Sequence, residues 1–215
     1  MAKTYVRINY ESIRNKIIKS AQLKGRPIAR KKAYDLFYRA REKMMRRFNE
    51  DFVTLEIEAG PEYKTKNISG TLDGYGNLFS FLGFNHGDKP IEALRNVLIQ
   101  KTDWQGSPTF NGKQWIFGVL YPTRKDIEAA CLTTPLPWNK ELPWIDIIEN
   151  GAPNLNHYLN LKKRDTTGKS YSWFGFQAAE EVNEDLEFKP RDYITERVLG
   201  NFRDTINNSR LQDKL

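Results

Sequence analysis

Apolar residues recur at helical spacing through the first fifty residues of the chain. The first group lies within residues 10–23 and consists of Ile13, Ile17, Ile18 and Ala21. The Gly25-Arg26-Pro27 sequence that follows predicts the end of this helix. A second apolar stripe predicts a longer amphipathic helix over residues 28–49, formed by Ala33, Phe37, Ala40, Met44 and Phe48. The pattern therefore predicts two N-terminal helices.

Alternating and continuous apolar runs predict strands in the middle of the chain. Residues 52–59 alternate with period two up to Gly60-Pro61, which is typical of a half-buried strand that ends at a turn. A short strand is expected over Leu78–Phe84, and the apolar run Trp115–Tyr121 predicts a central strand. The polar and Gly-containing segments between them predict loops, over residues 60–76 and 102–113.

Capping residues and prolines define the elements toward the C-terminus. Pro90 at a first helical position predicts a helix to about residue 100, and Thr123 followed by Asp126 predicts a capped helix start. Three prolines within residues 135–143 indicate a stiff, irregular crossover. The remaining expected elements are a helix from Trp144 that ends before Gly151, a strand over Tyr171–Ala178 and a helix over about 190–208.

These elements predict one α+β domain over residues 1–215, with a small, mostly antiparallel sheet packed against helices. Both ends of the domain are expected to be helical, and residues 1–50 form a basic helical N-terminal element. The composition, with 39% hydrophobic and 13% aromatic residues, is too apolar for a disordered chain. No apolar run reaches the roughly 18 residues of a membrane span, and the N-terminus lacks the apolar core of a secretory signal. We therefore expect a cytoplasmic origin.

Positive charge is concentrated at the N-terminus. Residues 1–50 hold 15 Lys and Arg against 4 Asp and Glu, about +11, whereas the other 165 residues carry about −4. Such a chain suits an acidic partner, either nucleic acid or a neighbouring copy of the chain. The candidate assembly or DNA-channel surface consists of Arg39, Lys43, Arg46 and Arg47. No motif that reads bases accompanies these cations, so the pattern leaves both partners open.

The residues that commonly carry catalysis or bind metals are sparse. His86 and His157 stand 71 positions apart, and neither has a metal-ligand neighbour at helical or hairpin spacing. Cys131, the single cysteine, falls inside a predicted helix, and we interpret it as a small buried residue. The Pro61–Lys64 segment, with Asp51 upstream, has the carboxylate and lysine of Mg²⁺-dependent nucleases, so a nuclease stays an alternative. We expect no catalytic residue, no cofactor and no metal.

Short motifs follow one another in a defined order along the chain. They are Pro143-Trp144-Ile145, Glu149-Asn150-Gly151 with Asn154-Leu155, Ser170-Tyr171-Ser172, Phe188-Lys189-Pro190 and Asp192-Tyr193-Ile194. Together with the N-terminal helix, the alternating segment at 52–59 and the Gly-containing loop after it, this order resembles the head-to-tail joining and tail-completion proteins of tailed bacteriophages. The resemblance spans most of the chain and is strongest to neck or tail-terminator proteins of large contractile phages.

The resemblance implies a non-enzymatic virion component, assembled in the host cytoplasm, that forms a ring between the portal complex and the tail tube or sheath. Such rings are commonly sixfold, and no family active site is carried over. A chain with polarised charge has the two complementary faces that a ring needs. Trp138 and Trp144 are the expected interface anchors. A nucleic-acid-binding protein and a Mg²⁺-dependent nuclease stay the alternatives, and DNA in the channel would be contacted without sequence preference.

Overall fold

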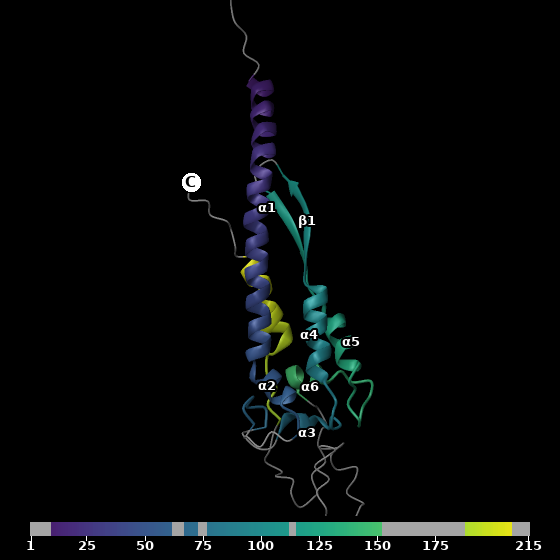
Figure 1. Ribbon diagram of the computed structural model, residues 1–215. Coiled ribbons are helices and arrows are strands. Elements are labelled where there is room, and N and C mark those ends of the chain that lie inside the picture. The colour runs from purple at the N-terminus through teal and green to yellow at the C-terminus, as the bar shows by residue number, and fades with distance from the viewer. Residues whose placement is uncertain (1–9, 62–66, 73–76, 112–114, 152–187, 208–215) are drawn as a thin grey trace, which may run out of the picture. The chain divides into compact units, whose positions relative to one another are not determined.

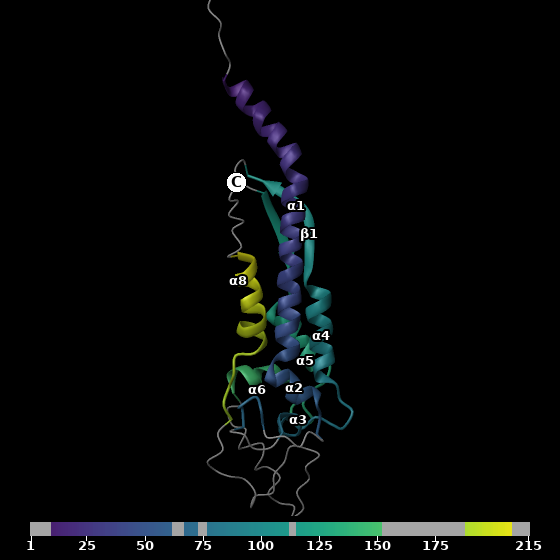
Figure 2. The ribbon, with the colours of Figure 1, turned by 60° about the vertical axis from the view of Figure 1, so that its left-hand side comes forward.

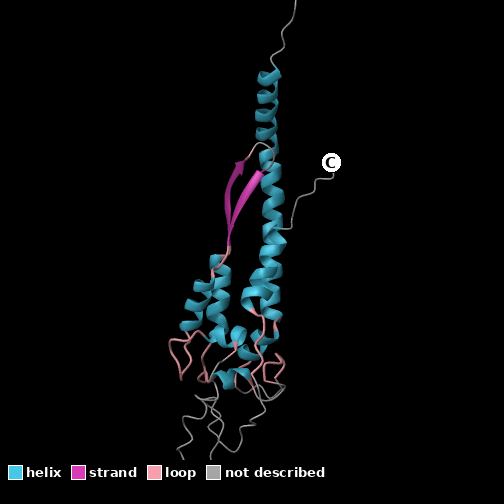
Figure 3. Ribbon diagram, turned by 180° about the vertical axis from the view of Figure 1, so that it is seen from behind, coloured by secondary structure: helices cyan, strands magenta, loops and turns pink. Residues whose placement is uncertain are grey.

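The computed structural model describes residues 10–61, 67–72, 77–111, 115–151 and 188–207 (Figure 1). Helices dominate these residues, and one β-hairpin accompanies them (Figure 3). The expected fold class is confirmed, with mixed helix and strand, a small antiparallel sheet and a long N-terminal helix. Two compact units divide the chain: a hairpin unit of residues 1–39 and 103–120, and a helical unit of residues 40–102 and 121–215. One domain over residues 1–215 stays a prediction.

Helix α1 runs from Tyr10 to Glu50 without interruption (Figure 1). The prediction of two helices divided at Gly25-Arg26-Pro27 is therefore wrong. Pro27 removes one backbone hydrogen bond, but this loss does not have to end a helix whose flanking residues are mostly Lys, Arg, Ala and Leu, all good helix formers. A Cβ on Gly25 would lie 3.8 Å from Nε1 of Trp115, so the hairpin approaches the helix at this point.

The hairpin consists of β1 (Asp103–Phe110) and β2 (Trp115–Leu120), which pair antiparallel (Figure 3). The register shifts between Gln105 and Thr109, as it does at a β-bulge. Strand β2 was predicted, but as a central strand, whereas it belongs to a two-stranded sheet. The sequence predicts a loop where β1 lies, because Gly106 and Pro108 are typical of loops, and this prediction is wrong. Both lie in the irregular part of the strand, where a bulge accommodates them.

The helical unit contains a series of short helices in addition to the end of α1. They are α2 (Phe52–Glu58), α3 (Leu78–Leu82), α4 (Pro90–Lys101), α5 (Arg124–Leu132), α6 (Trp144–Asn150), the π-helix η1 (Ile194–Gly200) and α8 (Asn201–Asn207). Their buried side chains form the core, in which Phe48, Leu94, Trp144, Ile148 and Tyr193 are fully buried. Figure 2 shows η1 and α8 beside the C-terminal part of α1, where the rings of Phe48 and Tyr193 stack at 6.3 Å.

The strand predicted over residues 52–59 is wrong, because these residues form helix α2. The apolar residues of this segment alternate, but burial follows a helical pattern that includes two polar side chains, Thr54 and Glu56. Leu55, which a strand would bury, is 40% exposed. The side chain of Asp51 accepts a hydrogen bond from the backbone N–H of Val53 at 3.0 Å, which caps the helix start.

The strand predicted over Leu78–Phe84 is also a helix, α3. Asn77 caps its start by accepting a hydrogen bond from Ser80 N at 3.1 Å. Gly83, with a φ of 82°, ends the helix in the left-handed conformation that glycine adopts without strain. The periodicity of a short apolar run is compatible with a strand or a helix. The capping residues Asn77 and Gly83 favour the helix.

Helices α4, α5 and α6 are confirmed with their expected ends. Pro90 begins α4, and Gly151, with a φ of 82°, follows α6. Thr123 and Asp126 form the predicted capping box, and the hydrogen bonds from Thr123 hold the pKa of the Asp126 carboxyl below its ordinary value. The C-terminal helix begins at Ile194, later than predicted, and the strand expected over Tyr171–Ala178 lies outside the described residues.

Candidate assembly and nucleic-acid surfaces

The four basic residues singled out from the sequence all lie on α1. Arg39, Lys43 and Arg46 are exposed, and Arg47 is partly exposed. At 100° per residue, the first three lie on one side of the helix, away from the buried stripe that includes Phe48. The helix therefore presents these charges to solvent, as the sequence pattern predicted.

The two tryptophans expected to act as interface anchors have different environments. Trp144 has no exposed area, and its ring packs edge-on against Phe84 at 5.9 Å. It belongs to the core of the helical unit, so its prediction as an exposed anchor is corrected. Trp138 is partly exposed, and its Nε1 donates a hydrogen bond to the carbonyl oxygen of Leu82 at 2.9 Å. The anchor role of Trp138 stays a prediction.

Large apolar side chains of the hairpin unit are exposed to an unusual degree. Ile17 is 63% exposed, Leu23 79% and Ile28 61%. Among the described residues of this unit, Phe37 is the one buried large side chain. The described residues of this unit thus form almost no core of their own, although α1 continues to Glu50 within the helical unit.

A cluster of aromatic rings joins α1 to the hairpin. Trp104 stacks on Phe117 at 5.1 Å between ring centroids, and it meets Phe37 at 5.9 Å. The ring of Tyr34 packs edge-on against Trp104 at 6.2 Å and stacks with Tyr38 at 6.4 Å. Sequence reasoning missed this cluster because Trp104 was placed in a loop. The i, i+4 spacing of the two tyrosines was the available signal.

The charge of the hairpin unit is strongly positive. Its residues include 12 Lys and Arg against 3 Asp and Glu, a net charge of +9. Three of the cations, Arg26, Arg30 and Lys31, are exposed on the turns of α1 that precede Tyr34. The exposed aromatic rings therefore lie next to a concentrated positive charge.

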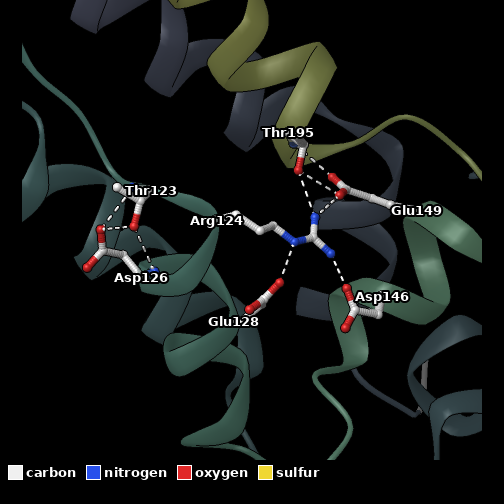
Figure 4. A network of polar contacts seen from close by, with 7 residues as sticks. All are labelled: Thr123, Arg124, Asp126, Glu128, Asp146, Glu149 and Thr195. Carbon is white, nitrogen blue, oxygen red and sulfur yellow. Dashed lines mark hydrogen bonds and ion pairs between the residues drawn. The ribbon is translucent and has the colours of Figure 1, made fainter.

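The helical unit contains a polar cleft centred on Arg124 of α5 (Figure 4). The guanidinium donates to Glu128 on its own helix at 2.8 Å, and to Asp146 and Glu149 on α6. Thr195, at the start of η1, receives a hydrogen bond from Arg124 at 2.7 Å and donates one to Glu149 at the same distance. Figure 4 shows the guanidinium at the centre of these groups. One arginine thus connects three helices.

Acidic groups outnumber basic ones in this cleft. Its volume is about 460 Å³, and its lining includes five carboxylates, those of Glu128, Asp146, Glu149, Asp192 and Glu196. Partial burial lowers the pKa of Arg124, but its hydrogen bonds to Glu128 and Glu149 outweigh that effect and raise the pKa. Arg124 therefore stays charged, and the lining keeps a negative excess that suits a cationic group.

A second pocket, of about 330 Å³, lies where α1 ends. Arg47, Glu50 and Asp51 line it together with residues of η1 and α8. The buried carboxylate of Asp51 lies 3.1 Å from Nε of Arg197. This ion pair holds η1 against the end of α1, and it places Arg47 beside a second arginine.

No protein family model matches this chain, and neither a curated protein nor a solved structure is similar to it. The surfaces described above and the short sequence motifs therefore carry the functional argument.

Within the described residues, no group of three or more His, Cys, Asp and Glu side chains could hold a metal ion. His86 lies in an exposed turn. Cys131 is buried, which confirms its interpretation, and burial raises the pKa of its thiol. Residues 62–64 of the nuclease-like segment lie outside the described residues, and Asp51 caps α2. None of the helices in the described ranges has the length and apolar character needed to cross a bilayer.

Proposed function

We propose that this chain is a non-enzymatic joining subunit of a tailed-phage virion, which assembles with copies of itself into a closed ring in the neck. The phage assignment is supported by the ordered motifs, such as Pro143-Trp144-Ile145, that resemble neck and tail-completion proteins. The assembly role is supported by the surface of the hairpin unit. A ring of six copies between the portal complex and the tail is what the resemblance implies.

The near absence of a core in the hairpin unit carries the assembly proposal. Burying a large aliphatic side chain contributes roughly 1.5–3 kcal/mol to the free energy of folding. The single chain gains little of this stabilisation from three exposed residues of α1, Ile17, Leu23 and Ile28. Long helices obtain most of their stability from packing of an apolar face. A neighbouring copy that covers Ile17 and Ile28 would supply that packing.

Two of the exposed aliphatic residues, Ile17 and Ile28, share one face of α1 with a basic residue, Arg39. Ile17, Ile28 and Arg39 follow one another at intervals of eleven residues, which brings them within roughly 20° of each other per interval around a helix. We name these three residues the assembly face. It combines apolar area with positive charge, so it fits a partner surface that is partly acidic.

The helical unit offers such a surface at the Arg124 cleft, which is lined by five carboxylates and one guanidinium. A contact between the assembly face of one copy and the acidic side of the next would join two different surfaces. Contacts of this heterologous kind generate closed rings when the rotation between copies closes. The polarised charge of the chain thus supports a ring.

Sedimentation of the full chain tests this proposal. Wild-type protein is expected to sediment as an oligomer, whereas Ile17→Asp with Ile28→Asp is expected to sediment as a monomer, because two charges replace the apolar contact. Leu55→Asp is the matched control, since Leu55 is an exposed apolar residue of α2 in the helical unit and does not line the Arg124 cleft. Equal sedimentation of all three proteins would contradict the assembly face.

A further inference from the structure

The exposed tyrosines of α1 lie outside the assembly face. Tyr34 and Tyr38 are each 48% exposed. Tyr34 follows Ile28 by six residues, which places it roughly 120° away around the helix. The contact proposed for the assembly face therefore does not account for the exposure of the two tyrosines.

The two tyrosine rings form a fixed platform. They stack on each other with an angle of 26° between their planes, and Trp104 supports Tyr34 edge-on at 84°. Trp104 is itself held by stacking on Phe117 of β2. A ligand that stacks on the tyrosines would meet rings that are already oriented, which lowers the entropy cost of binding.

The surroundings of the platform select an anionic partner. The hairpin unit carries a net charge of +9, and Arg30 and Lys31 are exposed one helical turn before Tyr34. Nucleic acid supplies both of the matching features, because it combines a negative backbone with flat bases that stack on aromatic side chains.

We propose that the platform of Tyr34, Tyr38 and Trp104 binds single-stranded nucleic acid. Unpaired bases stack on the tyrosine rings, while Arg30 and Lys31 neutralise the neighbouring phosphates. A duplex is a poorer ligand, because its bases already stack on each other and their faces are covered. The platform has no contacts that read base edges, so binding is independent of sequence. This activity goes beyond the proposed joining function and stands on separate residues.

Fluorescence anisotropy of labelled oligonucleotides tests the proposal on the full chain. The probes are an oligothymidine of about 12 nucleotides, within the site size of other single-strand binders, and a duplex of equal length. Wild-type protein is expected to bind the single strand more tightly. Tyr34→Ala with Tyr38→Ala is expected to weaken single-strand binding by at least about fivefold, since one lost base stack has that effect. The matched control, Tyr34→Phe with Tyr38→Phe, keeps the rings and should bind as the wild type does.

Salt dependence separates stacking from charge. Arg30→Gln with Lys31→Gln should reduce the slope of log affinity against log salt, whereas the tyrosine-to-alanine variant should leave that slope unchanged. If the double alanine variant does not fold, Tyr38→Ala alone carries the same expectation, because its ring contacts the exposed ring of Tyr34. Equal affinity for single strand and duplex, or alanine variants that bind like wild type, would overturn the proposal. Alanine variants that lose only self-association would show that the platform is a protein contact, which also overturns it.

Discussion

Arg124 shows how a single residue holds the helical unit together. Its guanidinium connects α5, α6 and η1 through carboxylates, one of which, Glu149, is only 8% exposed. Removing one partner of such a pair leaves charge without compensation, which costs 3–5 kcal/mol when the pair is fully buried. Arg124 is 30% exposed, so solvent reduces that cost.

We therefore expect Arg124→Met to lower the free energy of unfolding by about 2 kcal/mol, measured by urea denaturation. Lys101→Met is the control, because Lys101 forms an exposed ion pair with Asp126 at 3.5 Å. Exposed pairs contribute about 0–1 kcal/mol, so this variant should unfold almost as the wild type does. Equal losses in both variants would contradict the role of the Arg124 network.

Tyr193 links stability to alkaline pH. Its hydroxyl is fully buried and lies 2.6 Å from Oγ1 of Thr54, and burial raises its pKa well above the ordinary value. A raised pKa means that the folded state favours the neutral phenol, so this contribution is complete below the unfolded pKa of about 10 and is lost as pH rises further. Above that pH, the melting temperature of wild type should fall more steeply than that of Tyr193→Phe, whose ring cannot ionise. Parallel curves between pH 8 and 11 would refute this.

At the scale of elements, the sequence predicts those parts that depend on nearby residues. The start of α5 depends on Thr123 and Asp126, and the end of α6 depends on Gly151. These helix ends could therefore be predicted from residues adjacent in the sequence. Helix α2 could not, because it buries Glu56, whose carboxylate accepts hydrogen bonds from Asn67 Nδ2 at 2.8 Å and Leu78 N at 2.8 Å. Those partners are distant in sequence, and only the fold brings them together.

The same limit applies to the candidate surfaces. The basic face of Arg39, Lys43 and Arg46 could be predicted, because charge and helical spacing are visible in the sequence. The aromatic platform could not be predicted, because it includes Trp104 of β1. The sequence around Trp104 contains Gly106 and Pro108, which predict a loop and not a strand. The prediction of Trp144 as an exposed anchor was wrong. A tryptophan beside prolines can lie at the surface or in the core, and Trp144 is buried in the core.

Helix α1 is expected to become more stable when Gly25 is replaced by alanine. A Cβ at this position would meet only Nε1 of Trp115, at the ordinary contact distance of 3.8 Å. Glycine in a helix interior costs about 0.5–1 kcal/mol relative to alanine, so Gly25→Ala should slow amide exchange in α1 accordingly. Gly118→Ala is the control, because its Cβ would lie 2.5 Å from Oε1 and 3.2 Å from Cβ of Gln105, so the Gln105 side chain must shift and no stabilisation of α1 is expected. Faster exchange around residue 25 in the first variant would show that α1 is interrupted there.

At the scale of the whole molecule, charge and apolar exposure are both unevenly distributed. The hairpin unit carries +9, whereas the helical unit has 22 Lys and Arg against 24 Asp and Glu, a net charge of −2. Among the residues that the structure describes, the buried side chains belong almost entirely to the helical unit. The helical unit is thus stabilised by its own core, whereas the hairpin unit needs a partner to cover its apolar side chains. This property is expected of an assembly subunit.

A non-enzymatic subunit should not turn over nucleic acid. Incubation of the full chain with labelled DNA and Mg²⁺ or Mn²⁺ is expected to yield no cleavage products. Glu62→Gln is the decisive comparison, because Glu62 is the acidic residue of the nuclease-like segment. Metal-dependent cleavage that disappears in this variant would place the chain among the nucleases instead.

Native mass spectrometry of the purified full chain tests the central claim most directly, because a closed ring has one defined mass. We predict a single oligomer whose mass is a fixed multiple of 25.1 kDa at all concentrations above its assembly threshold. Six copies would agree with the resemblance to phage neck proteins. A monomer at every concentration, or an open series of masses with no preferred multiple, would contradict the account.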